Sequence, residues 1–335
     1  MSAKTSSLMS THGRLWYDDP IYRASWIIAP QCFALVLLAW IFGASPTGLS
    51  TPWGKPAAPP PVQEEELQSL RNQASTSREA MTKLEGMAAT GDPLSNFYMG
   101  TLYDPVFKVS KIVSPDVDKS VSHYEVAAKG GVALAKENLL NFFYIFPNYN
   151  RKDWVKACDI ASDQTVRATT IVLQLRGYCY AEGWGTTKID LVKAVGAFRG
   201  GAELGDARSQ AELGAYYSTG EGNLPRDNDM AVKFYKQAAD QKDLLGFYNL
   251  GACYDSGCGS LQKNPTEAAR LIALTLDSKF NLAINMLTTR PNSFSAQFWQ
   301  EMQRELVKRK VYSGPLDGVA NPAVVSAIKR MGAAN

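Results

Sequence analysis

Hydrophobic residues are distributed along this chain in two different ways. Trp26 to Ala44 contains no charged residue, and a helix of that length nearly spans the ~30 Å hydrocarbon core of a bilayer. Trp26 and Trp40 stand toward its ends, where interfacial aromatics are expected. The pattern predicts one transmembrane helix at residues 25–44. Farther along the chain, apolar residues recur at helical spacing in short segments, which predicts a series of amphipathic helices.

A cleaved signal peptide is the alternative interpretation of this apolar segment. The preceding residues form a long leader that contains Asp18 and Asp19, and Phe42 stands where a small residue is expected before a cut after Ala44. These features favour an uncleaved anchor. Basic residues precede the segment at positions 4, 14 and 23, whereas only Lys55 follows it closely. The positive-inside rule therefore predicts a cytoplasmic tail at 1–24 and export of the remainder.

Proline is concentrated directly after the apolar segment, at positions 46, 52, 56, 59, 60 and 61. Because proline favours extended polyproline II backbone, residues 45–62 are predicted to form a semi-rigid linker. Residues 63–90 come next as a polar segment with sparse apolar positions, and we expect one helix from Gln63 to Met87 that ends before Gly91-Asp92. This helix suits either a stalk or a cap on the next helices of the chain.

The next part of the chain repeats itself every 37 residues. Six sets of positions keep this spacing: Gly177, Gly214 and Gly251; Tyr180, Tyr217 and Tyr254; Gly183, Gly220 and Gly257; Gly185, Gly222 and Gly259; Ala194, Ala231 and Ala268; and Leu213 with Leu250. Each unit reads as L-G-x-x-Y-x-x-G-x-G, a variable turn and an alanine-rich amphipathic segment. This order predicts a helix, a glycine turn and a second helix.

Small residues at matching positions predict close approach of the two helices in each unit. We expect the repeated tyrosine to fill the gap between them and the paired glycines to provide backbone freedom at the end of the first helix. One such hairpin cannot bury its apolar face alone, so the units must stack. The predicted fold class is all-α, an α/α solenoid over residues 93–280.

These units resemble Sel1-like repeats, a branch of the tetratricopeptide-type solenoids. Three units match well over residues 169–279, and two looser units are expected at 93–130 and 131–165. The resemblance implies a scaffold that binds other proteins of the cell envelope, with a role in envelope organisation, regulation or secretion.

The C-terminal segment at 293–331 has a different pattern. A helix is expected to end near Lys310 and a second to begin at Pro322 after an Asn321 cap, with the turn Y-S-G-P-L-D-G between them. This resembles the peptidoglycan-binding type 1 module, although Asn321, Val324 and Met331-Gly332 depart from its pattern. The resemblance implies peptidoglycan contacts at Tyr312, Gly314, Asp317 and Gly318. Asp317-Gly318 also suits a purely structural turn, and we expect the short segment to dock on the last repeat.

Cysteine has two interpretations in an exported domain. Cys32 lies in the predicted span, and the other four, Cys158, Cys179, Cys253 and Cys258, permit disulfides in an oxidising compartment. We favour pairing Cys158 with Cys179, on helices that should pack together, and Cys253 with Cys258. Buried free thiols are the alternative. A metal site is not expected, because His123 is the sole histidine after the span and no C-x-x-C pair occurs.

Charge and motifs exclude several function classes. The 35 basic and 32 acidic residues nearly balance, so no nucleic-acid footprint is indicated. No G-x-S-x-G, H-E-x-x-H or phosphate-loop pattern occurs, and His123 is expected to be a packing or surface residue. We therefore predict no catalytic residue and no cofactor. The predicted function is an inner-membrane-anchored periplasmic scaffold for protein partners and peptidoglycan. The alternative is a structural subunit of a membrane or secretion complex without glycan binding.

Overall fold

The computed structural model describes residues 61–145 and 153–333. Every regular element in these ranges is helical, and no strand occurs in them. The predicted tail at 1–24 and span at 25–44 lie outside the described residues, as does the predicted linker up to residue 60. In the described ranges, no helix is both long and apolar enough to traverse a bilayer.

The described chain forms two units. The N-terminal unit comprises residues 61–145, 153–168 and 184–187, and the C-terminal unit comprises 169–183 and 188–333. The N-terminal unit contains α2 (Pro61–Ala74), α3 (Arg78–Ala89), α4 (Pro93–Tyr103), α5 (Val117–Lys129), α6 (Ala133–Leu140), the π-helical turn η2 (Asn141–Ile145) and α7 (Trp154–Ser162). The C-terminal unit contains α8 (Thr170–Glu182), α9 (Leu191–Glu203), α10 (Ala207–Thr219), α11 (Asn228–Asp240), α12 (Leu244–Ser256), α13 (Pro265–Asp277), α14 (Asn281–Thr289), the 3₁₀ turn η3 (Pro291–Ser293), α15 (Ala296–Lys308) and α16 (Pro322–Ala333).

The segment expected to be one helix from Gln63 to Met87 is instead two helices, α2 and α3. The break occurs at Ser75 to Ser77, and the Ser77 hydroxyl accepts a hydrogen bond from the backbone N–H of Ala80, which caps α3. Both helices pack on each other and on α4. The buried Arg71 side chain donates a 3.1 Å hydrogen bond to Thr101 Oγ1 on α4. Residues 61–89 therefore cap the α4–α5 pair and do not project as a stalk.

Helix boundaries in the C-terminal unit follow the 37-residue spacing. The carboxylates of Asp206 and Asp243 cap α10 and α12, accepting hydrogen bonds of 2.7 and 2.8 Å from the third backbone N–H of each helix. At the other end of α10, Gly220 adopts a left-handed conformation with φ of 78°, as Gly183 does after α8. The predicted role of these glycines is confirmed, since a residue with a Cβ atom is strained in that conformation.

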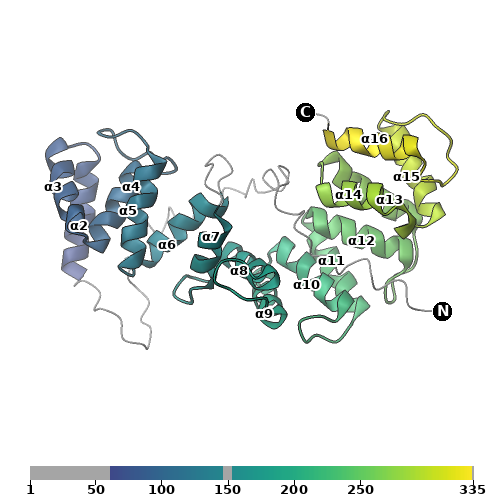
Figure 1. Cartoon of the computed structure of the whole chain (residues 1–335), viewed down its shortest axis with the longest axis horizontal. Helices are drawn as coiled ribbons and strands as arrows, with labels where there is room; N and C mark the ends of the chain where they lie inside the picture. Colours follow the sequence, from purple (N-terminus) through teal and green to yellow (C-terminus); the bar gives the residue numbers. More distant parts are fainter. Residues whose placement is uncertain (1–60, 146–152, 334–335) are drawn as a thin grey trace. The chain divides into compact units, whose positions relative to one another are not determined.

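Close packing within each repeat joins α8 to α9, α10 to α11 and α12 to α13, and the last two pairs lie side by side in Figure 1. A Cβ atom added to Gly177, Gly214 or Gly251 would lie 2.5 to 2.7 Å from Phe198, Tyr235 or Ile272 respectively. The expectation that Tyr180, Tyr217 and Tyr254 fill this gap is wrong. Those three rings are only partly buried, and the gap is filled by a large residue of the second helix.

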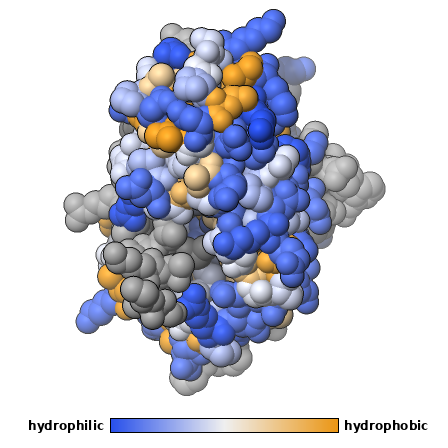
Figure 2. Space-filling model, turned by 90° about the vertical axis from the view of Figure 1, so that its right-hand side faces the viewer, coloured by the Kyte–Doolittle hydropathy of each residue, from blue (hydrophilic) through white to orange (hydrophobic). Residues whose placement is uncertain are grey.

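The C-terminal segment continues the core of the last repeat. Phe298, Met302 and Leu306 on α15 and Ile328 on α16 are fully buried in the same apolar cluster as α13. Asp255 on α12 fixes the start of α15, because its carboxylate accepts hydrogen bonds from the Ser295 hydroxyl and, at 2.9 Å, from the Ser295 backbone N–H. α15 packs on α13 and α16 on α14. Figure 2 shows the side of the molecule where α13 to α16 lie, and hydrophilic residues cover most of it around small apolar patches.

Candidate protein-binding groove and C-terminal turn

A surface groove lies between α11 and the loop after α12. Its volume is about 400 Å³. The lining residues come from one face of α11, the last turn of α12 and the loop: Val232, Lys236, Tyr254, Ser260, Leu261, Gln262, Lys263 and Asn264.

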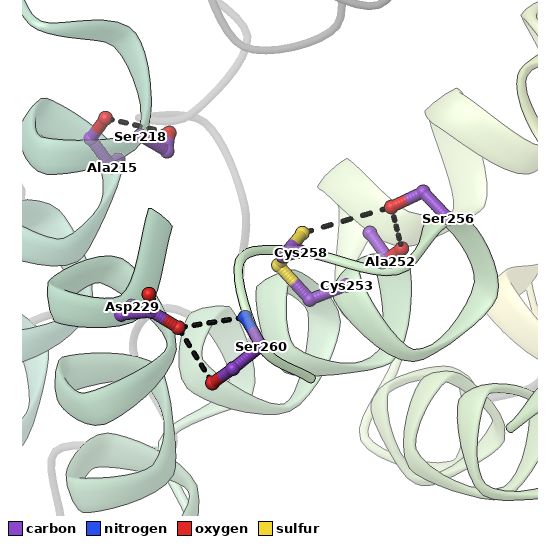
Figure 3. The surroundings of a disulfide bond; sticks show 8 residues. All are labelled: Ala215, Ser218, Asp229, Ala252, Cys253, Ser256, Cys258 and Ser260. Carbon is purple, nitrogen blue, oxygen red and sulfur yellow. Dashed lines mark hydrogen bonds between the residues drawn. A yellow bond between two sulfur atoms is a disulfide. The ribbon is translucent and has the colours of Figure 1, made fainter. Parts of the chain in front are cut away.

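Two sets of hydrogen bonds hold the loop in place beside α11. The backbone N–H of Asn264 donates a 2.8 Å hydrogen bond to the carbonyl of Tyr254, which closes the loop at its base. Near its middle, the backbone N–H and hydroxyl of Ser260 both donate 2.7 Å hydrogen bonds to Asp229 Oδ1 on α11 (Figure 3). These bonds hold the pKa of the Asp229 carboxyl below its usual value. The loop therefore has a defined position against the helix.

A disulfide fastens the same loop to α12. Cys253, buried on α12, is bonded to Cys258 in the loop, with a Cα–Cα distance of 5.1 Å (Figure 3). The Ser256 hydroxyl donates to the carbonyl of Ala252 at 2.9 Å and lies 3.6 Å from Cys258 Sγ. The disulfide thus restrains the loop that lines one side of the groove.

Groove chemistry combines an apolar wall with positive charge. Val232, the partly buried Leu261 and the ring of Tyr254 supply apolar surface. Lys236 and Lys263 are exposed, and neither ammonium group forms an ion pair or hydrogen bond with any described residue. No cluster of acidic, histidine or cysteine side chains suited to a metal ion occurs in residues 61–145 and 153–333. The groove can therefore bind a ligand that is both apolar and anionic.

The predicted peptidoglycan-contacting residues lie in the turn between α15 and α16, and two of them are engaged within the protein. Tyr312 is only 7 % exposed, and its hydroxyl donates a 2.9 Å hydrogen bond to the carbonyl of Pro315. The carboxylate of Asp317 accepts hydrogen bonds from Gln303 Nε2 at 2.7 Å and from the backbone N–H of Val319 at 3.0 Å. The Gln303 bond contributes most to lowering the pKa of Asp317. The buried Tyr312 ring is not accessible for stacking on a sugar.

Gly314 and Gly318 serve close backbone packing in this turn. A Cβ atom on Gly314 would lie 2.4 Å from the Tyr312 hydroxyl oxygen. Gly318 has a φ of 72°, and a Cβ atom there would lie 2.6 Å from the carbonyl oxygen of Ala296. Leu316 and Val319 are large apolar residues of the turn that are exposed, with 41 % and 55 % of their surface accessible.

The remaining candidate residues are buried or half-buried. Cys158 on α7 and Cys179 on α8 are fully buried, and their pairing with each other stays a prediction. His123 on α5 is partly buried, as expected for a packing residue. Its Nδ1 lies 2.8 Å from Asn96 Oδ1, and its ring stacks on Tyr103 with a centroid distance of 6.0 Å.

Sequence reasoning missed the groove itself. Tyr254 was identified through its 37-residue register and interpreted as core, whereas Lys236 and Lys263 belong to no obvious pattern in a single repeat. Comparing the same positions in the preceding repeat, where arginines occur at 199 and 226, would have identified them.

Comparison with known families addresses the repeat architecture directly. The family model of the Sel1 repeat matches residues 109–132, 175–206, 207–243 and 248–274. The last three matches coincide with the pairs α8–α9, α10–α11 and α12–α13. These helical pairs therefore match the Sel1 repeat in sequence. The α6–α7 pair and the segment after residue 274 have no match to this model, so the second of the two looser repeats remains a prediction.

Comparison with solved structures indicates the same fold. A Sel1 repeat protein from Oxalobacter formigenes is 22 % identical, with a TM-score of 0.51 over 81 % of this chain and 95 % of that one. The protein c5321, described as a protective antigen of uropathogenic Escherichia coli strains with an SLR fold, is 17 % identical, with a TM-score of 0.48 over 80 % of this chain and 60 % of that one. Comparison with curated proteins found no match.

Proposed function

We propose that this Sel1 repeat protein is a non-catalytic scaffold, anchored in a bacterial inner membrane by residues 25–44, whose periplasmic repeats bind another envelope protein. The observation that carries the proposal is the stack of Sel1 repeats in the C-terminal unit, with a groove of apolar and cationic residues at its surface. Sel1 repeats indicate protein binding, since solenoids offer extended surfaces built from successive units.

Two observations support the envelope location. The uncharged run from Trp26 to Ala44 suits a membrane helix, and the basic residues before it favour a cytoplasmic N-terminus. The Cys253–Cys258 bond also suits an oxidising compartment, because disulfides persist in the periplasm and are rare in the bacterial cytosol.

Topology is tested with reporters fused after Asn335. A reporter that is active only after export should be active, and one that fluoresces only in the cytosol should be dark. The reverse pattern would overturn the location. Partner binding is tested in living cells with a photo-crosslinking residue in place of Lys236 in the groove, or of the exposed Val307 on α15 as the control. We expect crosslinks to an envelope protein from position 236.

Peptidoglycan binding is a second proposal, and the exposed Leu316 and Val319 beside Asp317 support it. The full chain in detergent should sediment with purified sacculi. A Leu316→Asp/Val319→Asp variant should lose this retention, while Val307→Asp on the nearby α15 should keep it. Absence of retention in the wild type would favour the alternative, in which the C-terminal segment only caps the repeats of a structural subunit.

A further inference from the structure

Several residues that line the groove beside α11 have counterparts of the same chemical type one repeat earlier. Val232, Lys236, Tyr254, Leu261 and Lys263 stand 37 residues after Val195, Arg199, Tyr217, Leu224 and Arg226. Each position keeps its chemical type, with an aliphatic residue and a cation on the second helix, a tyrosine at the end of the next helix, and a leucine and a cation in the loop. Two neighbouring repeats therefore carry the same set.

Backbone geometry in the two loops also matches. The Asp227 N–H donates a hydrogen bond to the Tyr217 carbonyl at 2.8 Å, as Asn264 does to Tyr254. The Leu224 N–H donates to the Glu221 carbonyl at 3.3 Å, as Leu261 does to Cys258 at 2.9 Å. The leucine of each loop is thus placed by the same turn.

The means of fastening differ between the loops. Gly222 packs on α9, where a Cβ atom would lie 2.5 Å from Val195, and Gly259 packs on α11 beside Asp229. The disulfide and the Asp229–Ser260 hydrogen bonds belong to the later loop alone. The two loops therefore share their apolar and cationic positions, although different interactions hold each loop against its helix.

All four cations are exposed and form no ion pair or hydrogen bond with the described part of the chain. Nearby carboxylates do not neutralise them in the structure. Asp229 accepts from Ser260, and Asp227 accepts from the Met230 N–H as the cap of α11. Glu203 and Asp240 follow Arg199 and Lys236 by four residues without pairing to them. Unpaired charge beside apolar surface favours an anionic, partly apolar ligand.

We propose that these two sites bind an extended acidic segment of a partner protein, which places one apolar side chain beside each repeated tyrosine and leucine pair and sets its carboxylates against the four cations. A groove of about 400 Å³ is large enough for one leucine or phenylalanine side chain with adjoining backbone. The inference rests on the scaffold part of the proposed function and names the chemistry of the partner.

The test uses the full chain in detergent micelles and fluorescent synthetic peptides of alternating Asp/Glu and Leu/Phe. Fluorescence anisotropy at low salt should show binding that weakens as salt is added, because exposed charges are screened. Peptides with Asn/Gln in place of the acids, or Ser in place of the apolar residues, should each bind at least about tenfold more weakly.

The groove variant is Arg199→Glu/Arg226→Glu/Lys236→Glu/Lys263→Glu, and we expect it to bind the acidic peptide at least about tenfold more weakly than the wild type. The matched control, Lys83→Glu/Lys111→Glu/Lys129→Glu/Lys329→Glu, changes net charge equally at exposed positions elsewhere and should stay within about twofold of the wild type. Circular dichroism checks that both variants keep their helices.

Equal losses in both variants, no binding of the acidic peptide, or equal binding of its serine version would overturn the proposal. So would binding of anionic lipid vesicles in place of the peptide. If crosslinks to an envelope protein from position 236 persist when Arg199, Arg226 and Lys263 are changed to Glu, the scaffold function stands and the acidic-segment proposal is wrong. If the reporter after Asn335 is cytosolic, the proposed location fails whatever the peptide does.

Discussion

Gly214 on α10 lies directly against the ring of Tyr235 on α11. A methyl group on Gly214 would lie 2.7 Å from Tyr235 Cε1 and 3.1 Å from the carbonyl oxygen of Ala231. Tyr235 is fully buried, so its ring has no free space into which it can move. Gly177 and Gly251 lie equally close to Phe198 and Ile272 in the flanking repeats, which explains why this position is glycine in all three repeats.

Gly214→Ala is therefore expected to destabilise the C-terminal unit by about 1–3 kcal/mol, the usual cost of overpacking a dense core. Gly196 on α9 provides the control, because no atom lies within 4 Å of the place where its Cβ would be. Gly196→Ala should be neutral or stabilise by up to about 1 kcal/mol, since alanine favours the helix. The free energy of unfolding of both variants is measured in urea. If Gly214→Ala and Gly196→Ala are equally stable, the Tyr235 ring does not restrict position 214.

His123 is expected to make the stability of the N-terminal unit depend on pH. Burial lowers the pKa of its imidazole below the ordinary value of 6.5, and this effect exceeds the opposing one of Glu85. As pH falls through 6.5, the unfolded chain gains a proton that the folded unit still excludes. Stability is therefore complete above about pH 6.5 and is lost as pH falls toward the lowered folded value.

Hydrogen exchange of α5 amides between pH 8 and pH 5, corrected for intrinsic rates, measures this loss. His123→Gln should remove most of the pH dependence, because glutamine can still donate to Asn96 but does not titrate in this range. A slope that persists in the variant would assign the effect to other groups.

The loop after α12 should respond to reductant, while the loop after α10 should not. The disulfide between Cys253 and Cys258 should stabilise the closed loop by about 2 kcal/mol, because it lowers the conformational entropy of the opened chain. Reduction should therefore raise amide exchange in residues 257–264 by up to about 30-fold, where exchange occurs by local opening. Residues 220–227 contain no cysteine and serve as the internal control. Equal acceleration in both loops would mean that the bond restrains more than its own loop.

The spacing of 37 residues predicted the fold well, because it identifies equivalent positions in successive units without any knowledge of contacts. It could not show which positions meet within a unit. Gly177 packs on Phe198, which lies 21 residues away on another helix, whereas the predicted Tyr180 lies on the same helix as the glycine. Repetition alone carries no information about that pairing.

The sequence predicted that the C-terminal segment docks on the last repeat, but not which side chains of its turn would be buried. The pattern Y-S-G-P-L-D-G correctly indicated a turn between two helices, with Asn321 accepting hydrogen bonds from the backbone N–H groups of Ala323 and Val324. A motif does not reveal solvent exposure, and Tyr312 and Gln303 are buried because α15 docks on the last repeat. Only long-range packing decides that Asp317 faces a protein amide.

Gln303 is expected to determine the conformation of this turn. Its fully buried amide donates to Asp317 Oδ1 at 2.7 Å and to the Val319 carbonyl at 3.0 Å, and it accepts from the Gly318 N–H at 3.0 Å. Gln303→Leu keeps the side-chain volume but leaves the buried Gly318 N–H without its acceptor. The expected loss is about 2–3 kcal/mol of stability in the C-terminal unit.

Gln300→Leu is the matched change one turn earlier on α15, where the half-buried side chain donates a solvent-exposed hydrogen bond of 3.0 Å to the Leu316 carbonyl. It should cost less than about 0.5 kcal/mol. Carboxyl titration by NMR gives an independent readout, because loss of the Gln303 donor should raise the pKa of Asp317 toward its ordinary value, while Gln300→Leu should leave it unchanged. If the two variants have the same free energy of unfolding and the pKa of Asp317 does not change, the packing of α15 and α16 holds the turn. The hydrogen bonds of Gln303 would then not determine its conformation.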